Sequence, residues 1–257
     1  MLTRRHGAIL KLLEARGALA VGTLSQELGV STETVRRDIR ALVEAGAAVR
    51  VHGAVGLAGQ IGEAPFERRM RENAAAKRAI ARTMAERIGD GDSLMLDTGT
   101  TTSFLARALL DRRRMTVVTN SLDIARTLAT VNGNRVFMAG GALRGDSGAA
   151  LGATALEFIR GFTVQHAIIS AGAVDGAGVM DFDLQEAEFA RAVLACGERR
   201  VVVTDASKFG RRGFVRVAGF DGLHDLVTDQ PPPAGIAAAI AAAGISVTLA
   251  TADDDGR

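Results

Sequence analysis

Most of the side chains in this sequence that could bind a ligand stand directly after short β-rich runs in the C-terminal two thirds of the chain. Five runs end in polar or glycine-containing clusters, which cover residues 97–102, 119–121, 140–144, 171–172 and 205–208. Glycine lets the backbone approach a ligand closely, while hydroxyl, amide and charged groups supply hydrogen-bond donors and acceptors. The clusters are candidates for one binding site if the fold brings them together.

An open parallel sheet would do so. From Ser93 on, β-rich runs alternate with helical stretches, which is the pattern of an α/β domain. The expected strands cover residues 93–96, 115–118, 135–139, 166–170, 200–204, 226–228 and 245–249. The carboxyl ends of parallel strands share one edge, where ligands bind. The sequence therefore predicts a C-terminal α/β domain with an open, mostly parallel sheet and a single pocket at that edge.

The first cluster favours phosphate. Gly99 allows close approach, and Thr100, Thr101 and Thr102 place hydroxyls where a helix begins. The N-terminus of a helix attracts phosphate through its N–H groups and its dipole. The cluster therefore predicts a phosphate-binding turn.

The other charged residues at this edge suggest what carries the phosphate. Three of the 31 basic residues are lysine, so Lys208 is a candidate phosphate ligand, with Arg144 as a second cation. Asp97, Asp183 and Glu186 would repel phosphate but can accept hydrogen bonds from sugar hydroxyls. We therefore expect a phosphorylated sugar or polyol, bound by Asp97, Gly99, Thr100, Thr101, Thr102, Asn120, Ser121, Gly140, Gly141, Arg144, Asp183, Glu186 and Lys208.

Two alternatives remain open for this site. Any single cluster, and Gly140-Gly141 above all, is also consistent with an ordinary strand-to-helix turn. The carboxylates and Lys208 could also transfer protons, which would suit a sugar-phosphate isomerase.

The first 57 residues have the pattern of a winged helix-turn-helix. An apolar stripe predicts a first helix, and Thr23 with Gln26 predicts a capping box at the start of a second helix. Gly29 supplies the turn, and Ser31 caps a third helix whose Val35, Ile39 and Leu42 face the core. Residues 49–53 then alternate as a short hairpin.

This arrangement presents polar and basic residues to DNA. Arginine can hold guanine edges or phosphate with its planar fork. A solvated helix face would explain an isolated arginine pair equally well, but the turn and the hairpin around it favour DNA contact. Asp38, which phosphate would repel, is expected to pair with an arginine instead. The candidate DNA-binding residues are Ser31, Thr32, Glu33, Thr34, Arg36, Arg37, Arg40, Arg50 and His52.

The distribution of charge also separates a DNA-binding N-terminal region from the rest of the chain. Residues 1–78 contain 13 Lys and Arg against 8 Asp and Glu, whereas residues 79–257 contain 18 against 21. A basic N-terminal region joined to a mildly acidic body is typical of a nucleic-acid-binding head on a separate domain. The expected limits are 1–57 for the DNA-binding domain, 58–73 for a linker and 74–257 for the effector domain.

Several other classes of protein are disfavoured. The single cysteine, Cys196, excludes internal disulfides, and the four scattered histidines form no metal-binding motif. No G-x-G-x-x-G follows the first strand of the C-terminal domain, so neither a dinucleotide nor another cofactor is expected, and no catalytic residues are assigned. The N-terminus does not resemble a signal peptide, and no run is apolar enough to enter lipid, so we expect a cytoplasmic protein without membrane contact.

Two sets of motifs resemble the DeoR-type family of bacterial transcriptional regulators. The N-terminal set comprises residues 30–39 (VSTETVRRDI), Leu42, Gly46 and residues 50–54 (RVHGA), where the family usually has R-x-H-G-G-A and this chain has one glycine fewer. The C-terminal set comprises Asp97-x-Gly99-Thr100-Thr101, residues 118–121, Gly140-Gly141-x-x-Arg144, Gly152, Asp183-x-x-Glu186 and residues 205–210. Residues 181–183 and 228–233 resemble the glycerol-3-phosphate branch of the family, although Gln185 stands where that branch tends to have histidine.

The resemblance implies a winged helix-turn-helix joined to an effector domain like a sugar-phosphate isomerase, and a repressor of a sugar or polyol catabolic operon. The expected partners are a double-stranded DNA operator and a phosphorylated sugar or polyol, with glycerol 3-phosphate the leading candidate. Helix-turn-helix proteins usually read paired half-sites, so we expect a homodimer or homotetramer. The alternative is an isomerase-like enzyme that carries a DNA-binding head.

Overall fold

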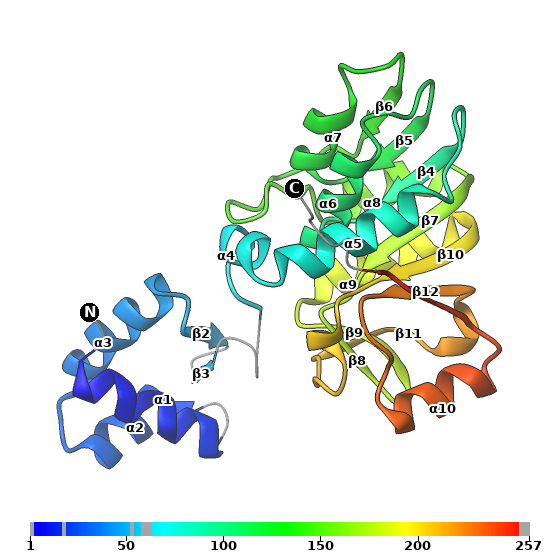
Figure 1. The fold of residues 1–257 in the computed structure, drawn as a ribbon. Coiled ribbons are helices and arrows are strands. Elements are labelled where there is room, and N and C mark those ends of the chain that lie inside the picture. Colours follow the sequence, from blue (N-terminus) through cyan, green and yellow to red (C-terminus); the bar gives the residue numbers. More distant parts are fainter. Residues whose placement is uncertain (1–2, 17–18, 52–53, 58–62, 252–257) are drawn as a thin grey trace, which may run out of the picture. The chain divides into compact units, whose positions relative to one another are not determined.

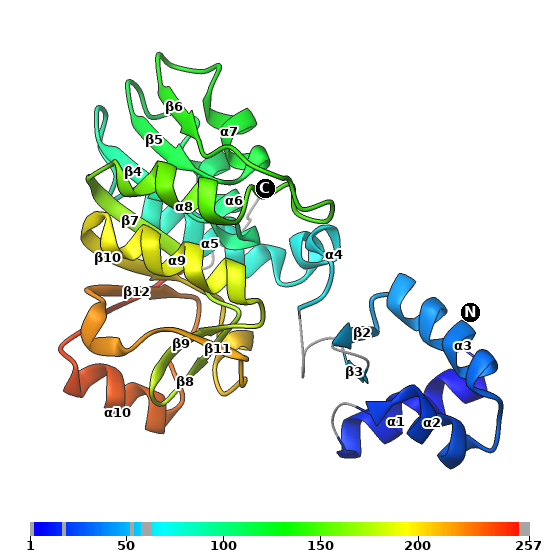
Figure 2. The same ribbon diagram turned by 180° about the vertical axis from the view of Figure 1, so that it is seen from behind.

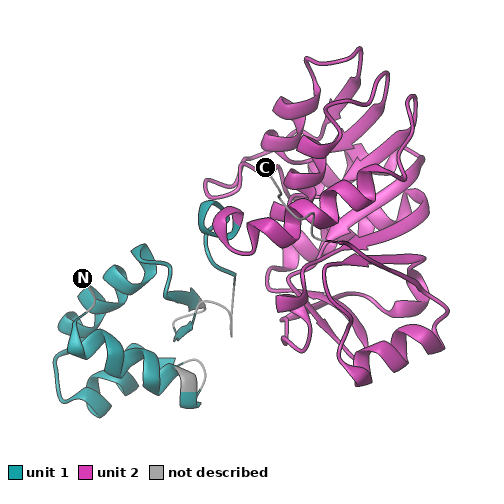
Figure 3. Cartoon of the chain, in the orientation of Figure 1, with its two compact units in different colours: residues 1–69 teal, residues 70–257 magenta. Residues whose placement is uncertain are grey.

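The computed structural model describes residues 3–16, 19–51, 54–57 and 63–251 of the chain. These form two compact units, residues 1–69 and 70–257, which Figure 3 distinguishes by colour. The boundary between the units, after Arg69, falls within the segment predicted as a linker. This segment contains helix α4 (Phe66–Arg71), and residues 58–62 lie outside the described residues. The exact domain limits therefore remain a prediction.

The N-terminal unit is a winged helix-turn-helix (Figure 1). Its helices are α1 (Arg4–Arg16), α2 (Val21–Leu28) and α3 (Thr32–Glu44), and its strands are β1 (Leu19–Ala20), β2 (Ala48–Val51) and β3 (Ala54–Leu57). The strands form an antiparallel sheet in the order β1-β3-β2. Ile9, Leu13, Leu24, Ile39 and Leu42 are fully buried between the helices and this sheet.

The turn at Gly29 and helix α3 are as the sequence predicts, whereas helix α2 begins earlier than predicted. Gly29 has φ 63° and ends α2 in the left-handed conformation, which a residue without Cβ adopts without strain. Ser31 caps α3 and accepts a hydrogen bond from the N–H of Thr34 at 3.2 Å. The capping box at Thr23 is wrong, because α2 begins at Val21 without a side-chain cap. Strand β1 pairs with β3 up to Ala20, so the chain enters the helix directly from the sheet.

A parallel seven-stranded sheet forms the centre of the C-terminal unit. Its strands are β4 (Ser93–Leu96), β5 (Thr116–Thr119), β6 (Arg135–Met138), β7 (Val164–Ser170), β10 (Gly197–Val203), β12 (Asp225–Thr228) and β13 (Ser246–Leu249). All seven correspond to the predicted runs, so the predicted fold class of an open parallel sheet is confirmed. The order is β13-β12-β10-β7-β4-β5-β6. The chain therefore winds outward from β4 to one side and from β7 to the other.

Helices cover both faces of this sheet (Figures 1 and 2). Helices α5 (Ala74–Ala85), α6 (Thr100–Ala108) and α7 (Leu122–Leu128) pack on one face, with Ile80, Leu105 and Ile124 buried against the strands. Helices α8 (Ala153–Arg160), α9 (Leu184–Ala195) and α10 (Ala234–Ala242) pack on the other face, where Phe189 and Val193 are buried. The result is three layers with an apolar core on each side of the sheet.

A small antiparallel sheet, which the sequence analysis missed, branches from the main one. It consists of β8 (Ala173–Asp175), β9 (Gly178–Asp181) and β11 (Val215–Ala218) in the order β11-β9-β8. Two short 3-10 helices, η1 (Ala206–Lys208) and η2 (Phe220–Gly222), complete the described elements. Among the helices described, none is long and apolar enough to cross a membrane.

Candidate functional site

The centre of the carboxyl edge is a hydrogen-bonded contact between β4 and β7. Asp97 follows β4, and its Oδ2 accepts hydrogen bonds from the backbone N–H of Ser170 at 2.9 Å and from the Ser170 hydroxyl at 3.2 Å. Strands β4 and β7 are neighbours from which the chain winds in opposite directions. Such a switch point is where open α/β sheets bind ligands.

Asp97 is a buried carboxylate with one unused oxygen. Its residue is 6% exposed, and Oδ1 is buried without a hydrogen-bond partner among the described residues. Burial raises the pKa of Asp97 to about 7 and the charge of Asp181 adds to the rise, whereas the N–H and hydroxyl of Ser170 and the hydroxyl of Thr102 oppose it. The group is therefore partly protonated at neutral pH and can accept or donate a hydrogen bond.

The next residues form the start of α6. Gly99 is the N-cap in an extended conformation, and a Cβ there would lie 2.0 Å from the Ser170 hydroxyl oxygen. Thr100 and Thr101 are buried in the first turn, where backbone N–H groups have no partner within the helix. The Thr102 hydroxyl donates to the carbonyls of Asp97 and Gly99 at 3.1 and 3.0 Å, so it holds the turn together.

The residues after β5 supply a second buried acceptor. Asn120 is fully buried and its Nδ2 donates to the carbonyl of Ala150 at 3.0 Å, while its Oδ1 has no partner in the described part of the chain. The Ser121 hydroxyl caps α7 by accepting from the N–H of Ile124 at 3.4 Å. Ser121 therefore has a structural role, and Asn120 retains a free acceptor.

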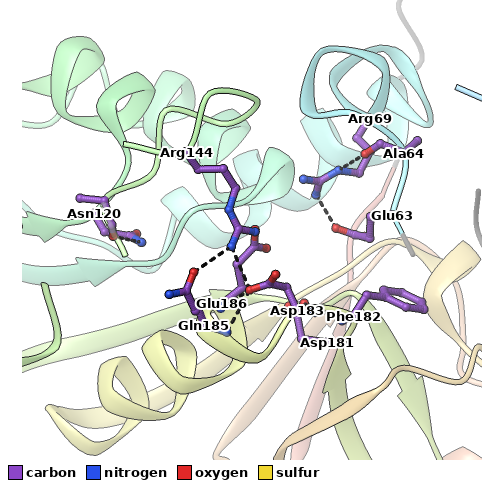
Figure 4. Close-up of polar contacts among 11 residues, drawn as sticks. Glu63, Ala64, Arg69, Asn120, Arg144, Asp181, Phe182, Asp183, Gln185 and Glu186 are labelled. Atoms are coloured by element: carbon purple, nitrogen blue, oxygen red, sulfur yellow. Dashed lines mark hydrogen bonds and ion pairs between the residues drawn. The ribbon is translucent and has the colours of Figure 1, made fainter. Parts of the chain in front are cut away.

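Arg144 is held by the start of α9 (Figure 4). Its guanidinium donates to Glu186 Oε1 at 2.6 Å, to Asp183 Oδ1 at 3.0 Å and to Gln185 Oε1 at 3.3 Å. Asp183 also caps α9 by accepting from the N–H groups of Gln185 and Glu186 at 2.9 and 3.1 Å. Burial alone would raise the pKa of Asp183, but the bonds from Arg144 and the two N–H groups outweigh it and lower that pKa. These charges, which the sequence analysis assigns to a ligand, are paired with one another in the structure.

The remaining predicted residues also lie at this edge. Gly140 and Gly141 follow β6 and are exposed, and Gly141 has φ 141°. Lys208 ends η1, which follows β10, and its N–H donates to the carbonyl of Asp205 at 3.1 Å. Strands β10, β7, β4, β5 and β6 are consecutive neighbours, so the polar clusters share one edge of the sheet.

Two residues at this edge were missed. Ser170 contacts Asp97, and Asn73, just before α5, donates through Nδ2 to Asp205 Oδ1 at 3.0 Å and Ser207 Oγ at 3.1 Å. An asparagine before a helix is the only signal for Asn73, and it predicts a cap that the side chain does not make.

One surface of α3 is polar and exposed. Thr32, Glu33, Arg36, Arg37 and Arg40 are exposed, opposite the buried Val35, Ile39 and Leu42. Arg36 and Glu33 form an exposed ion pair at 3.5 Å. Ser31 and Thr34 bond to each other at 2.9 Å between their hydroxyl oxygens. The arginines therefore project from the helix that follows the glycine turn.

Two further predictions concern the wing and the core of the N-terminal unit. Arg50 is exposed on β2, whereas His52 lies outside the described residues. Asp38 is buried and pairs with the guanidinium of Arg5, whose Nη2 lies 2.9 Å from Oδ1, and with His6 Nε2 at 3.4 Å. The prediction that Asp38 pairs with an arginine is confirmed.

Comparison with known proteins identifies both units. A family model described as a DeoR-like helix-turn-helix domain matches residues 5–60, and one described as a DeoR C-terminal sensor domain matches residues 72–230. The glycerol-3-phosphate regulon repressor of Escherichia coli (strain K12) is 33% identical over 235 residues, which cover 91% of this chain and 93% of that protein. The chain belongs to the DeoR family of transcriptional repressors.

A second relative and one solved structure are also similar to this chain. The HTH-type transcriptional repressor CsqR of the same Escherichia coli strain is 33% identical over 250 residues, covering 97% of this chain and 96% of that protein. The solved structure of ribose 5-phosphate isomerase A from Neisseria gonorrhoeae is similar at a TM-score of 0.39 and 19% identity, covering 53% of each chain. The two relatives of this DeoR-family protein described above are named as repressors, which implies a regulator.

A cavity of about 390 Å³ lies elsewhere on the sensor unit of this DeoR-family protein. Helices α8 and α9 line it with Leu156, Arg160, Glu188, Arg191, Ala192 and Ala195. The lining includes none of the predicted ligand residues. In the described part of the chain, no group of three or more His, Cys, Asp or Glu residues could hold a metal ion.

Replacing Gly99 with alanine is expected to destabilise the sensor unit of this DeoR-family protein. The added Cβ would meet Ser170 Oγ at 2.0 Å and Ser170 Cβ at 2.7 Å. The double variant Gly99→Ala/Ser170→Gly removes both clashes and should recover most of the lost melting temperature in thermal unfolding. A single variant as stable as the wild type would contradict the close approach.

The protein should also lose stability through Asp97 as pH rises from about 4 to about 7. The pKa of Asp97 is about 7 in the native state, so the native protein binds this proton more tightly than the unfolded chain does. The protonated group therefore stabilises the native state at low pH, and this stabilisation is lost as the pH rises to the native pKa. A shift of three pKa units corresponds to at most about 4 kcal/mol. Asp97→Asn cannot ionise, so it should gain stability relative to the wild type between pH 5 and pH 8.

Urea unfolding at both pH values measures this difference. Asp111→Asn, at an exposed position, is the control and should follow the wild type. An equal pH dependence in wild type and Asp97→Asn would show that Asp97 titrates normally.

Proposed function

We propose that this DeoR-family protein is a cytoplasmic repressor whose affinity for operator DNA changes when a phosphorylated sugar or polyol binds at the carboxyl edge of the sensor sheet. Helix α3 supplies the base contacts through Arg36, Arg37 and Arg40, and Arg50 on the wing contacts the backbone or the minor groove. Phosphate contacts supply most of the affinity, and base contacts supply the specificity. A homodimer or homotetramer places two such helices on paired half-sites.

The proposed binding of a phosphorylated sugar or polyol rests on buried hydrogen-bond acceptors that have no partner among the described residues. Asp97 Oδ1 and Asn120 Oδ1 follow adjacent strands, and both are buried and unpaired among the described residues. Buried polar atoms of this kind are rare, because each loses its bonds to water without replacement. Hydroxyl groups of a sugar or polyol are donors that would satisfy both.

The phosphate group of the effector would bind at the start of α6, at the same edge of the sheet. The first turn of α6 offers the N–H groups and hydroxyls of Thr100 and Thr101 beside Asp97. The partial protonation of Asp97 reduces its repulsion of a phosphate. Lys208 follows β10 at the same edge, whereas Arg144 is paired with Asp183 and Glu186. An anion site next to unpaired acceptors therefore favours a ligand with both phosphate and hydroxyl groups.

Glycerol 3-phosphate is the leading effector. Support comes from residues 181–183 and 228–233, and from the similarity to a protein named glycerol-3-phosphate regulon repressor. A coupling of roughly 1–3 kcal/mol between the two sites would change operator affinity about 5–150-fold.

The DNA half predicts that Arg36→Ala and Arg37→Ala each weaken binding to an operator duplex selected from random DNA. Loss of a base or phosphate contact costs about 1–3 kcal/mol, or about 5–150-fold in affinity. Lys11→Ala is the control, since it removes an exposed positive charge from α1 of the same unit. Mobility-shift titration measures the three affinities. Wild-type affinity in both arginine variants would remove them from the interface.

The sensing half predicts that glycerol 3-phosphate raises the melting temperature of the protein, whereas glycerol with inorganic phosphate does not. A ligand at 100 times its Kd stabilises by about 2.7 kcal/mol. Thr101→Val should reduce this shift, and Thr163→Val, at an exposed position, should not. Fructose phosphates and other pentose and hexose phosphates complete the panel. No stabilisation by any of them would contradict sensing, and turnover of one would favour the isomerase alternative.

A further inference from the structure

Asn73 occupies an unusual position at the start of the sensor unit. It is the N-cap of α5, four residues after Arg69, the last residue of the N-terminal unit. Its φ of 52° and ψ of 32° lie in the left-handed region, which residues other than glycine seldom adopt. The side chain makes no cap for α5, so it does not hold the helix end in the usual way.

The side chain instead bonds to a loop far away in the sequence. Asn73 Nδ2 donates to Asp205 Oδ1 at 3.0 Å and to Ser207 Oγ at 3.1 Å. Asp205 is 2% exposed, and the same Oδ1 accepts from the N–H and the hydroxyl of Ser207. One amide therefore ties the beginning of α5 to the turn that follows β10.

This turn also carries a candidate effector residue. Asp205 caps η1, which ends at Lys208, and the N–H of Ala206 donates to Asp229 Oδ1 at 2.7 Å. The N–H of Lys208 donates to the carbonyl of Asp205 at 3.1 Å. These bonds connect residues 205–208 to one another and, through Asp205 and Ser207, to Asn73.

We propose that Asn73 is a positioning residue that links the turn at residues 205–208 to the segment leading to the DNA-binding unit. The inference rests on the proposed function, since it names the route by which the effector site changes operator affinity. Helix α4 ends at Arg71, so the conformation at Asn73 sets the direction in which the chain leaves α4 and enters α5.

In this proposal the contact of Asn73 with residues 205–208 has two states. In one, the bonds to Asp205 and Ser207 hold Asn73 in its left-handed conformation. In the other, an effector phosphate draws Lys208 and its turn away, and the Asn73 backbone relaxes and redirects the junction of α4 and α5. Linkage is reciprocal, so DNA bound to the first unit must also alter residues 205–208.

The variant Asn73→Gly separates the side chain from the backbone. Glycine adopts the left-handed conformation freely, so the variant keeps the turn and loses the two hydrogen bonds. Ser207→Ala removes one acceptor from the other side of the contact. Asn132→Gly is the matched control, because Asn132 has φ 55° and its Nδ2 donates to backbone carbonyls, including that of Arg112 at 3.1 Å, before β6 at the opposite edge.

Two readouts test the link in the full chain. Hydrogen exchange over residues 203–210, with and without a saturating operator duplex, should change in the wild type and Asn132→Gly but not in Asn73→Gly or Ser207→Ala. Glycerol 3-phosphate should change the operator affinity of the wild type and Asn132→Gly about 5–150-fold, and that of Asn73→Gly less than about 2-fold. Without effector, Asn132→Gly should bind the operator as the wild type does, whereas Asn73→Gly and Ser207→Ala should bind it with an affinity closer to that of the wild type with effector.

The outcomes separate this inference from the proposed function. An unchanged exchange of residues 203–210 on DNA binding to the wild type, or an equal change in Asn73→Gly, would overturn the role of Asn73. A lower melting temperature in Asn73→Gly with its exchange response retained would assign it a structural role only, and would overturn the inference as well. If glycerol 3-phosphate has no effect on the wild type while DNA still alters the exchange in the expected variants, the effector is wrong and the link stands.

Discussion

The hydrogen bonds from Ser170 to Asp97 are the interaction on which the sensor unit depends. They join β4 to β7 at the point where the chain begins to wind in opposite directions. The contact requires a glycine two residues later, because a Cβ at Gly99 would occupy the space of the Ser170 hydroxyl. The same geometry starts α6 at the edge of the sheet and buries one carboxylate oxygen without a partner. The candidate effector site is therefore a consequence of how these two strands meet.

The edge and its polar clusters could be predicted because each strand is a short apolar run bounded by turn residues. Their convergence follows from the parallel topology and requires no knowledge of side-chain contacts. The small sheet was missed because β8 has three residues and β9 has four, too few for alternation to stand out. The start of α2 was misplaced because pairing of β1 with β3 decides it, and such pairing cannot be read from local propensity.

Side-chain pairings are the part of the site that sequence cannot give. Arg144 was assigned to phosphate, but the fold places it against Asp183 and Glu186, 39 and 42 residues away. Asn73 was missed because its partners lie 132 and 134 residues further on. In both cases the tertiary structure determined the partner of the side chain. The exposed arginines of α3 were easier to assign, because the apolar stripe of one helix fixes which side faces outward.

A crystal structure of the protein with glycerol 3-phosphate tests the central claim most directly. The account predicts that the phosphate lies against the first turn of α6, at Thr100 and Thr101, and that the hydroxyl groups reach Asp97 and Asn120. A ligand bound anywhere else, such as the cavity between α8 and α9, with Asp97 and Asn120 untouched, would contradict it.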